Sequence, residues 1–214
     1  MLLHDSDAVA ALEANVCSMF GILGTGSGGH LLDTPTRLVY ESPVPQAPYN
    51  AVFRFYDDGD RPIGLQVQEL VARFASRPVT PCWLVHPTTP PAVRGHLEVA
   101  GWTCAETLSG MVASLSDVPA PPPVPENIDV IETAVEDAAI WLDLVTWRYG
   151  LAAESSPYLR EIYDKAIKGH SRPWVASVDG TPVSKVVLHV CDGVAGIYGV
   201  ATTEQGRGQG IASL

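Results

Sequence analysis

A glycine-rich segment near the end of the chain has the residue types and the spacing of an anion-binding loop. It reads Gln205-Gly206-Arg207-Gly208-Gln209-Gly210, with glycine at every second position. Because glycine has no Cβ, such a loop can turn sharply and leave its backbone N–H groups uncovered. A helix beginning near Gly208 would add unpaired first-turn donors and the positive end of its dipole. With Arg207 and the side-chain amide of Gln205 as further donors, the loop is expected to bind a pyrophosphate.

An isolated glycine loop is often only the exit from a strand, so the elements before it matter. Three strands are expected at residues 174–178, 183–190 and 194–201, joined by Asp179-Gly180 and Asp192-Gly193, which are strong two-residue hairpin signals. A strand at 128–131 and two helices precede them. The first helix has Thr133 with Glu136 as a capping box and ends at Gly150, and the second begins at Ser156-Pro157. Residues 127–214 are thus predicted to form a strand, two helices and an antiparallel meander.

In this context the segment resembles the GNAT-type N-acetyltransferase superfamily. That family's acetyl-CoA motif, Gln/Arg-x-x-Gly-x-Gly/Ala, lies between its fourth strand and third helix, where this chain has the glycine-rich segment. The resemblance implies that backbone groups of one strand end pair with the pantetheine arm and that the loop amides hold the pyrophosphate. The implied cofactor-binding residues are Val200, Ala201, Gln205, Gly206, Arg207, Gly208, Gln209 and Gly210.

Two departures from the family pattern concern the acid–base half of the site. Val194 stands where the family often has a glutamate base early in the fourth strand. The sequence also stops at Leu214, about one turn into the expected cofactor helix, and the usual thiolate-protonating tyrosine lies beyond that point. Whether the chain is a piece of a longer protein is left open.

Amine acetylation needs a base for the ammonium proton, donors for the developing oxyanion and a proton for the leaving thiolate. Tyr149 and Glu154, between the two helices, lie where relatives admit the acceptor. His189 and Tyr198 lie on the meander strands, although His189 could also be an ordinary satisfied sheet residue. The candidate catalytic residues are Glu154, Tyr149, His189 and Tyr198.

The N-terminal part looks like a second, degenerate copy of half of the same fold. After an apolar helix ending at Gly24, it predicts strand 51–56, helix 63–74, strand 82–85, helix 90–99 and strand 102–115. Its His96–Trp102 segment is similar to the helix end and Gly-aromatic step of family members. Its loop Asp57–Pro62 lacks the glycine spacing, and three acids there would repel phosphate. We therefore expect this half not to bind cofactor.

A proline-rich run separates the two parts and sets the predicted domains. The fold class is α/β (α+β), with a GNAT-like, mixed and mainly antiparallel sheet flanked by helices in two half-domains. The predicted boundaries are 1–117 for the N-terminal domain, 118–126 for the linker and 127–214 for the acetyl-CoA-binding domain. Whether the N-terminal part completes the C-terminal sheet or builds its own is left open.

The composition of the chain bears on its cellular location and its binding partners. The chain has 24 acidic and 13 basic residues, a formal charge of −11, and 46% apolar residues. The acidic balance argues against nucleic acid as a partner, and no uninterrupted apolar run of about 18 residues predicts a membrane span. We expect a cytoplasmic protein with a small-molecule or peptide amine substrate, and an unfinished sheet edge that favours a homodimer.

Two other sequence patterns do not predict a binding site. Gly24–Gly29 satisfies GxGxxG, but a helix precedes it, so a helix-to-strand loop is expected rather than a dinucleotide site. The four cysteines and six histidines form no metal-ligand spacing, so no metal is expected. The function indicated is transfer of an acetyl group from acetyl-CoA to an amine by direct attack. The alternative is a non-catalytic GNAT-like module that binds CoA or serves in interactions.

Overall fold

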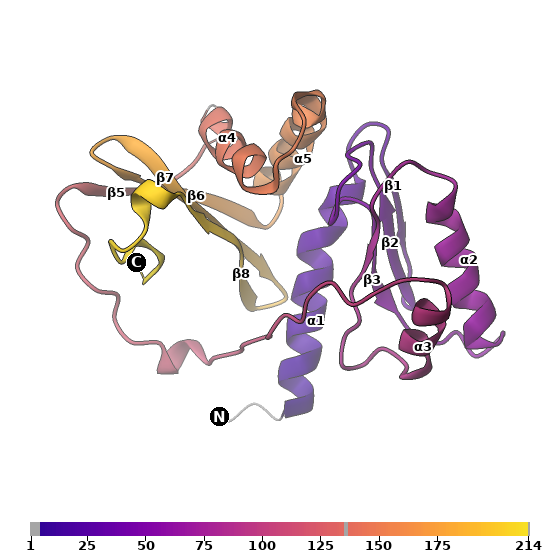
Figure 1. Cartoon of the computed structure of the whole chain (residues 1–214). Coiled ribbons are helices and arrows are strands. Elements are labelled where there is room, and N and C mark those ends of the chain that lie inside the picture. Colours follow the sequence, from indigo (N-terminus) through magenta and orange to yellow (C-terminus); the bar gives the residue numbers. More distant parts are fainter. Residues whose placement is uncertain (1–4, 135–136, 214) are drawn as a thin grey trace. The chain divides into compact units, whose positions relative to one another are not determined.

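The computed structural model of the chain describes residues 5–134 and 137–213 (Figure 1). The chain divides into two compact units, one of Phe20–Met111 and one of Met1–Met19 with Val112–Leu214. Each unit contains its own four-stranded sheet flanked by helices. The predicted mixed α/β fold class with two half-domains is confirmed.

In the unit of residues 20–111, three antiparallel strands are followed by one parallel strand. The strands are β1 (His30–Asp33), β2 (Arg37–Glu41), β3 (Ala51–Phe55) and β4 (Cys82–Trp83), in that order across the sheet. The helices are α2 (Ile63–Ala75) and α3 (Ala92–Val99). β4 runs parallel to β3 because the chain crosses over through α2 between them.

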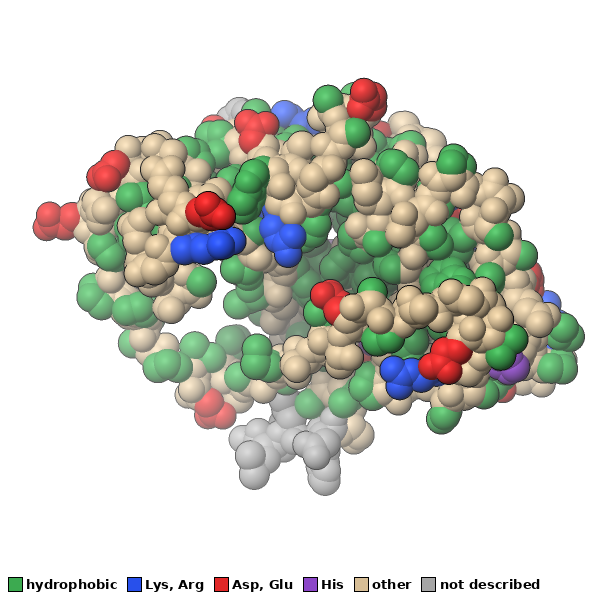
Figure 2. All heavy atoms as spheres, in the orientation of Figure 1, with side chains coloured by type: hydrophobic (Ala, Val, Ile, Leu, Met, Phe, Trp, Pro, Cys, Tyr) green, Lys and Arg blue, Asp and Glu red, His purple; other side chains and the backbone are tan. Residues whose placement is uncertain are grey.

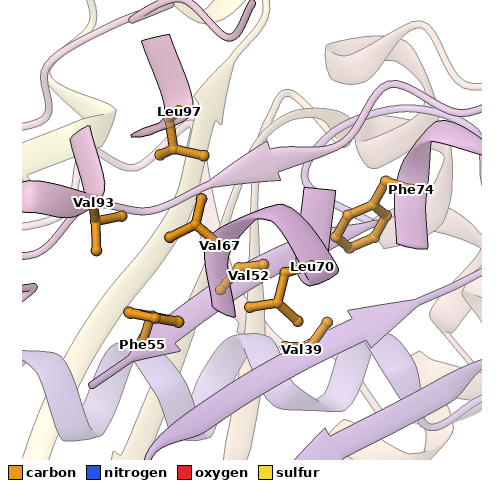
Figure 3. Close-up of a cluster of buried hydrophobic side chains, with 8 residues drawn as sticks. All are labelled: Val39, Val52, Phe55, Val67, Leu70, Phe74, Val93 and Leu97. Carbon is orange, nitrogen blue, oxygen red and sulfur yellow. The ribbon is translucent and has the colours of Figure 1, made fainter. Parts of the chain in front are cut away.

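The core of this unit lies between the sheet and these two helices (Figure 3). Residues 67, 70 and 74 of α2 recur at helical spacing and so share one face, which packs on the sheet. The buried cluster consists of Val39, Val52, Phe55, Val67, Leu70, Phe74, Val93 and Leu97. Each such side chain contributes about 1.5–3 kcal/mol by leaving water, which fixes both helices on the sheet.

The predicted elements of this part are mostly found, with one error and one omission. Helices 63–74 and 90–99 and strands 51–56 and 82–85 are observed as α2, α3, β3 and the shorter β4. The strand predicted at 102–115 is wrong, because residues 102–114 have no regular structure and large side chains such as Leu108 and Met111 lie in solvent. Strands β1 and β2 were not predicted, although Val39 and Tyr40 of β2 are residue types enriched in strands.

The unit that includes residues 112–214 has an antiparallel meander with two helices on it. Its strands are β5 (Ile128–Glu132), β6 (Ser171–Val178), β7 (Thr181–Cys191) and β8 (Val194–Thr202), and its helices are α4 (Ala138–Tyr149) and α5 (Ser156–Lys168). Asp179 and Asp192 both have φ near +49°, and the glycines after them have φ near +76°. These values are those of two-residue type I′ hairpins, so both predicted turns are confirmed.

The ends of α4 differ in how well they were predicted. Gly150, at φ +60°, ends the helix in the left-handed conformation that glycine adopts without strain. Of the predicted capping box, Glu136 lies outside the described residues. The Thr133 hydroxyl donates to the carbonyl of Pro173 over 3.1 Å and accepts from the Tyr163 hydroxyl over 2.9 Å. Thr133 therefore ties β6 to α5.

Helix α1 (Asp5–Gly21) contacts the meander through polar side chains. The Asn15 side-chain amide donates to the carbonyl of Val194 over 2.9 Å, and the Tyr198 hydroxyl donates to Asn15 Oδ1 over 2.5 Å. The stretch Ser6–Gly24, which includes α1, is long and apolar enough to cross a membrane by length and composition alone, as some soluble core helices and signal sequences also are. This stretch was not predicted from the sequence, because polar residues such as Glu13 and Asn15 interrupt its apolar run.

Candidate functional site

The first half of the glycine-rich loop is closed by its own hydrogen bonds. After β8, residues Glu204–Gly206 form one 3₁₀ turn, in which the Gly206 amide donates to Thr203 over 3.0 Å and the Arg207 amide to Glu204 over 3.3 Å. Gly206 is buried, and a Cβ on it would lie 2.9 Å from the Cβ of Val183. Gly206 is therefore needed for close packing on β7.

The second half of the loop is open. Gly208 and Gly210 have φ of +76° and +74°, and a Cβ added at either would meet no atom within 4 Å. Within the described part of the loop, the amides of residues 208–210 donate to no backbone carbonyl. These left-handed angles also exclude the α-helix expected from Gly208, and a single 3₁₀ turn at Ile211–Ser213 is found instead. The uncovered amides of residues 208–210 are the ones available to an anion.

Polar side chains border these amides. The Gln209 side-chain amide donates to the Gln205 carbonyl over 2.9 Å and so braces the loop across Arg207. Arg207 is exposed and pairs with no carboxylate of residues 5–134 or 137–213. Its guanidinium is thus available as a donor directly before the open amides in the sequence.

The end of β8 carries a β-bulge beside this loop. Ala201 pairs with Lys185 and Tyr198 pairs with Val187, so Gly199 and Val200 together oppose one residue of β7. The Val200 side chain is 52% exposed, whereas Ala201 is buried. Of the two residues expected to contact a pantetheine arm, Val200 lies in the bulge and Ala201 in the regular ladder.

Lys185 is buried beneath the bulge, with 2% of its surface exposed. Its Nζ donates to the carbonyl oxygen of Gly199 over 2.7 Å and lies 5.1 Å from the ring centroid of Trp141 and 5.5 Å from that of Tyr149. Both distances suit cation–π contacts. Burial, and secondarily the positive charge of Arg148, lower the pKa of Lys185 to about 8. Lys185 was not among the residues predicted from the sequence; its signal is a lysine directly before the apolar run Val186–Leu188 of a strand.

Two of the predicted catalytic residues, His189 and Tyr198, lie together but face α1. Their rings are 6.5 Å apart, and His189 Nε2 lies 2.9 Å from the hydroxyl oxygen of Ser18 on that helix. His189 Nδ1 lies 2.9 Å from the Ser171 hydroxyl. Burial, followed by the charge of His170, lowers the pKa of His189, and burial raises the pKa of Tyr198 to about 12. The polar atoms of both side chains thus have partners within the chain.

The other two predicted catalytic residues, Tyr149 and Glu154, lie in different surroundings. Tyr149 ends α4 and packs its ring against Lys185 on one contact and against Arg148, at 5.4 Å, on another. Glu154 is exposed in a short 3₁₀ turn, Ala153–Ser155, between α4 and α5. The structure therefore joins Tyr149 to the lysine beneath the bulge and leaves Glu154 in solvent.

A pocket of about 750 Å³ lies at the opposite end of β7 from the glycine loop. Its lining includes Glu132, His170, Arg172, Leu188 and Val190. The loop follows Thr202, which pairs with Ser184, whereas the pocket surrounds the part of β7 near His189. The pocket and the open amides are therefore separate features of the same sheet.

In the N-terminal unit, the loop between β3 and α2 satisfies its amides with its own carboxylates. The Gly59 amide donates to Asp57 and the Asp60 amide to Asp58, each over 3.1 Å. Asp58 also pairs with Arg37 over 2.9 Å. The Gly59 amide is the main cause that lowers the pKa of Asp57. These contacts support the expectation that this half does not hold a phosphate.

Basic side chains do not gather into one patch on the face shown in Figure 2, where they lie scattered among acidic ones. No group of three or more His, Cys, Asp or Glu side chains that could hold a metal ion occurs among the described residues.

Comparison with known proteins agrees with the topology of this unit. The sequence model of the acetyltransferase (GNAT) family matches residues 138–214. No curated protein matches the sequence. The match begins at α4 and includes the meander and the glycine-rich loop, which are the elements that carried the resemblance.

Solved structures resemble the whole chain in fold at low sequence identity. A GCN5-related N-acetyltransferase from Kribbella flavida is 15% identical, with a TM-score of 0.60 over 94% of this chain and 76% of its own. A tandem GNAT protein from the clavulanic acid biosynthesis pathway is 14% identical, with a TM-score of 0.52 over 99% of this chain and 80% of its own. Residues 138–214 are thus similar in sequence to the acetyltransferase (GNAT) family, and the fold of the chain is similar to that of a tandem GNAT protein.

Proposed function

We propose that the chain binds acetyl-CoA and transfers its acetyl group to an amine by direct attack of the amine on the thioester. The observation that carries this proposal is the open half of the glycine loop, residues 208–210, placed directly after the last meander strand. Backbone amides with no internal partner, next to an exposed arginine, are suited to a diphosphate. The match of the acetyltransferase (GNAT) family model to this segment supports acyl transfer in general.

The residues present fit the cofactor in part. The amides of Gly208, Gln209 and Gly210 would hold phosphate oxygens with Arg207, whereas those of Gly206 and Arg207 are used within the loop. Val200 lies with Gly199 in the bulge, where the backbone of β8 leaves the regular ladder and could pair with the pantetheine arm. When bound, acetyl-CoA supplies the activated acyl group; the protein contributes anchoring and orientation.

The test is binding of acetyl-CoA to the full chain, measured by calorimetric titration and by thermal stabilisation. Gly208→Leu is expected to abolish both, because its side chain would project into the space over the open amides. Gly193→Leu is the matched control, since Gly193 has the same φ of +76° and the same open surroundings in the β7–β8 turn. Binding that is unaffected by Gly208→Leu, or absent in the wild type, would overturn the proposal.

The second candidate is a non-catalytic module that binds CoA. It is favoured by His189 and Tyr198, whose polar atoms are engaged with Asn15, Ser18 and Ser171 rather than presented to a substrate. A panel of small amines and peptides separates the two functions. Turnover of any amine above the rate without protein supports the enzyme, and cofactor binding without any turnover supports the module.

We infer a small-molecule or peptide amine as the acceptor, a cytoplasmic location, and pairing of two chains through the edge strand β8. The last follows from β8 having a sheet neighbour on one side only among the described strands. Light scattering of the purified chain tests the dimer.

A further inference from the structure

Lys185 is the buried member of a small set of amines. The chain has three lysines, Lys165, Lys168 and Lys185. Lys165 and Lys168 lie on the exposed surface of α5, where Lys165 pairs with Glu161 over 2.8 Å. Lys185 pairs with no carboxylate of the described residues, and its ammonium group contacts one carbonyl oxygen and two aromatic rings. An uncompensated buried charge is unfavourable for folding, so packing alone does not account for it.

The position of this amine connects it to the site proposed above. The backbone of Lys185 pairs with Ala201, and its Nζ contacts the carbonyl of Gly199. Both ends of the residue therefore contact the stretch 199–201, where the proposed function places the acyl-bearing arm. The amine lies one layer below the surface, because the Tyr149 ring that covers it is 40% exposed and the Val200 side chain is 52% exposed.

The surroundings of the amine also contain an unused hydrogen-bond donor. The indole Nε1 of Trp141 is buried and has no acceptor among the described residues. The Trp141 ring is the one over which Lys185 Nζ lies at 5.1 Å. A carbonyl group added to the lysine nitrogen would bring an acceptor into this environment and would remove the buried charge. The free chain thus has a donor without an acceptor and a charge without a counter-ion at one place.

We propose that Lys185 is an acyl acceptor within the chain itself, a self-acetylation site that uses the cofactor held by the glycine loop. This proposal rests on the proposed function. In the reaction, the neutral Nζ attacks the thioester carbonyl carbon, a C–N bond forms and the C–S bond breaks. The thiolate of CoA leaves, and the proton lost by the nitrogen goes to that thiolate or to solvent. The product is a neutral amide.

The lowered pKa of Lys185, about 8, gives a fraction of neutral amine near neutral pH that an ordinary lysine does not have. Tyr149 and Trp141 hold this amine in one place, so that less conformational entropy is lost on reaction. The product would lack the charged donor that now holds Gly199, so acetylation is expected to loosen the bulge and weaken later cofactor binding.

The experiment is incubation of the full chain with acetyl-CoA, followed by intact mass and peptide mapping. We expect one added acetyl group, located at Lys185, formed at least about ten times faster than at Lys165 or Lys168, because a bound thioester has a high effective concentration. The two surface lysines report non-enzymatic acetylation in the same sample. In urea-unfolded chain the preference for Lys185 should disappear.

Variants separate this inference from the proposed function. Lys185→Arg should abolish the fast modification while thermal stabilisation by acetyl-CoA persists, and Lys168→Arg should leave the modification of Lys185 unchanged. Because the mapping is done on the wild-type chain, the test holds even if Lys185→Arg does not fold. Cofactor binding with Lys185 unmodified would overturn the self-acetylation alone. No cofactor binding in the wild type would overturn the proposed function and this inference with it.

Discussion

Gly206 packs so closely on Val183 that a Cβ on this glycine would lie 2.9 Å from the Cβ and Cγ2 atoms of the valine. The contact joins the first turn of the glycine-rich loop to the middle strand of the meander. It fixes where the loop leaves the sheet, and therefore where the open amides two residues later are presented.

Gly206→Ala is expected to destabilise the chain by about 1–3 kcal/mol, because Val183 and Thr202 must move to admit the methyl group. It should also weaken acetyl-CoA binding, because the loop shifts with it. Gly180→Ala is the control: it imposes left-handed strain of about 1–2 kcal/mol in the β6–β7 turn, where a Cβ meets nothing. Denaturant unfolding and calorimetry check both. Equal affinity losses in the two variants would show that the contact does not position the loop.

Lys185→Met is expected to stabilise the chain at neutral pH. Burial lowers the pKa of Lys185 from 10.5 to about 8, so the folded state binds fewer protons than the unfolded state between these values. The stability of the wild type then rises with pH across this range, and below pH 8 the protonated side chain costs about 3 kcal/mol relative to the neutral amine.

The measurement is the free energy of unfolding of wild type and Lys185→Met as a function of pH. The free energy of unfolding of the variant should exceed that of the wild type most below pH 8. This difference should decrease by about 3 kcal/mol as the pH approaches 10.5. Lys168→Met, on the exposed surface of α5, is the control for the removal of a lysine. A constant difference between wild type and Lys185→Met would contradict a depressed pKa.

Asn15 is expected to couple α1 to the meander through both ends of its side-chain amide. Asn15→Leu removes the acceptor of the Tyr198 hydroxyl and the donor to the Val194 carbonyl, which leaves buried polar groups unpaired and should cost about 1–3 kcal/mol. Tyr198→Phe should cost about 0.5–1.5 kcal/mol. The double variant should lose less than the sum of the two, since the pair is already broken. Additive losses in chemical denaturation would argue against the coupling.

The order of elements in the C-terminal unit was predictable from local chemistry. Asp-Gly pairs specify two-residue hairpins, and Gly150 specifies the end of α4, so the meander and its helices follow from the sequence. The loop was predicted as an anion site, but which of its amides are used internally depends on the turn at Glu204–Gly206, and that turn depends on packing against Val183. Local spacing does not contain this information.

The role of Lys185 could not be predicted for a different reason. A lysine in a strand usually extends its ammonium group to solvent along the apolar part of its side chain. Here α4 places Trp141 and Tyr149 over the amine, and these residues lie more than 30 positions away in the sequence. The same holds for His189 and Tyr198, whose partners come from α1. Side-chain burial by distant elements is the part of the site that composition and periodicity do not reveal.

His189 gives the last prediction, which concerns stability in acid. Burial and the nearby His170, with ring centroids 6.3 Å apart, hold the pKa of His189 below its ordinary value of 6.5. Because the folded pKa is depressed, the stability contributed by the neutral ring is full above 6.5 and is lost as the pH falls through the folded pKa. The free energy of unfolding of His189→Gln should therefore fall less on acidification than that of the wild type.

In His170→Gln, an NMR titration should find the pKa of His189 raised toward its ordinary value, since a like charge has been removed. An unchanged His189 titration in that variant would mean that burial alone, and not the neighbouring histidine, holds the ring neutral.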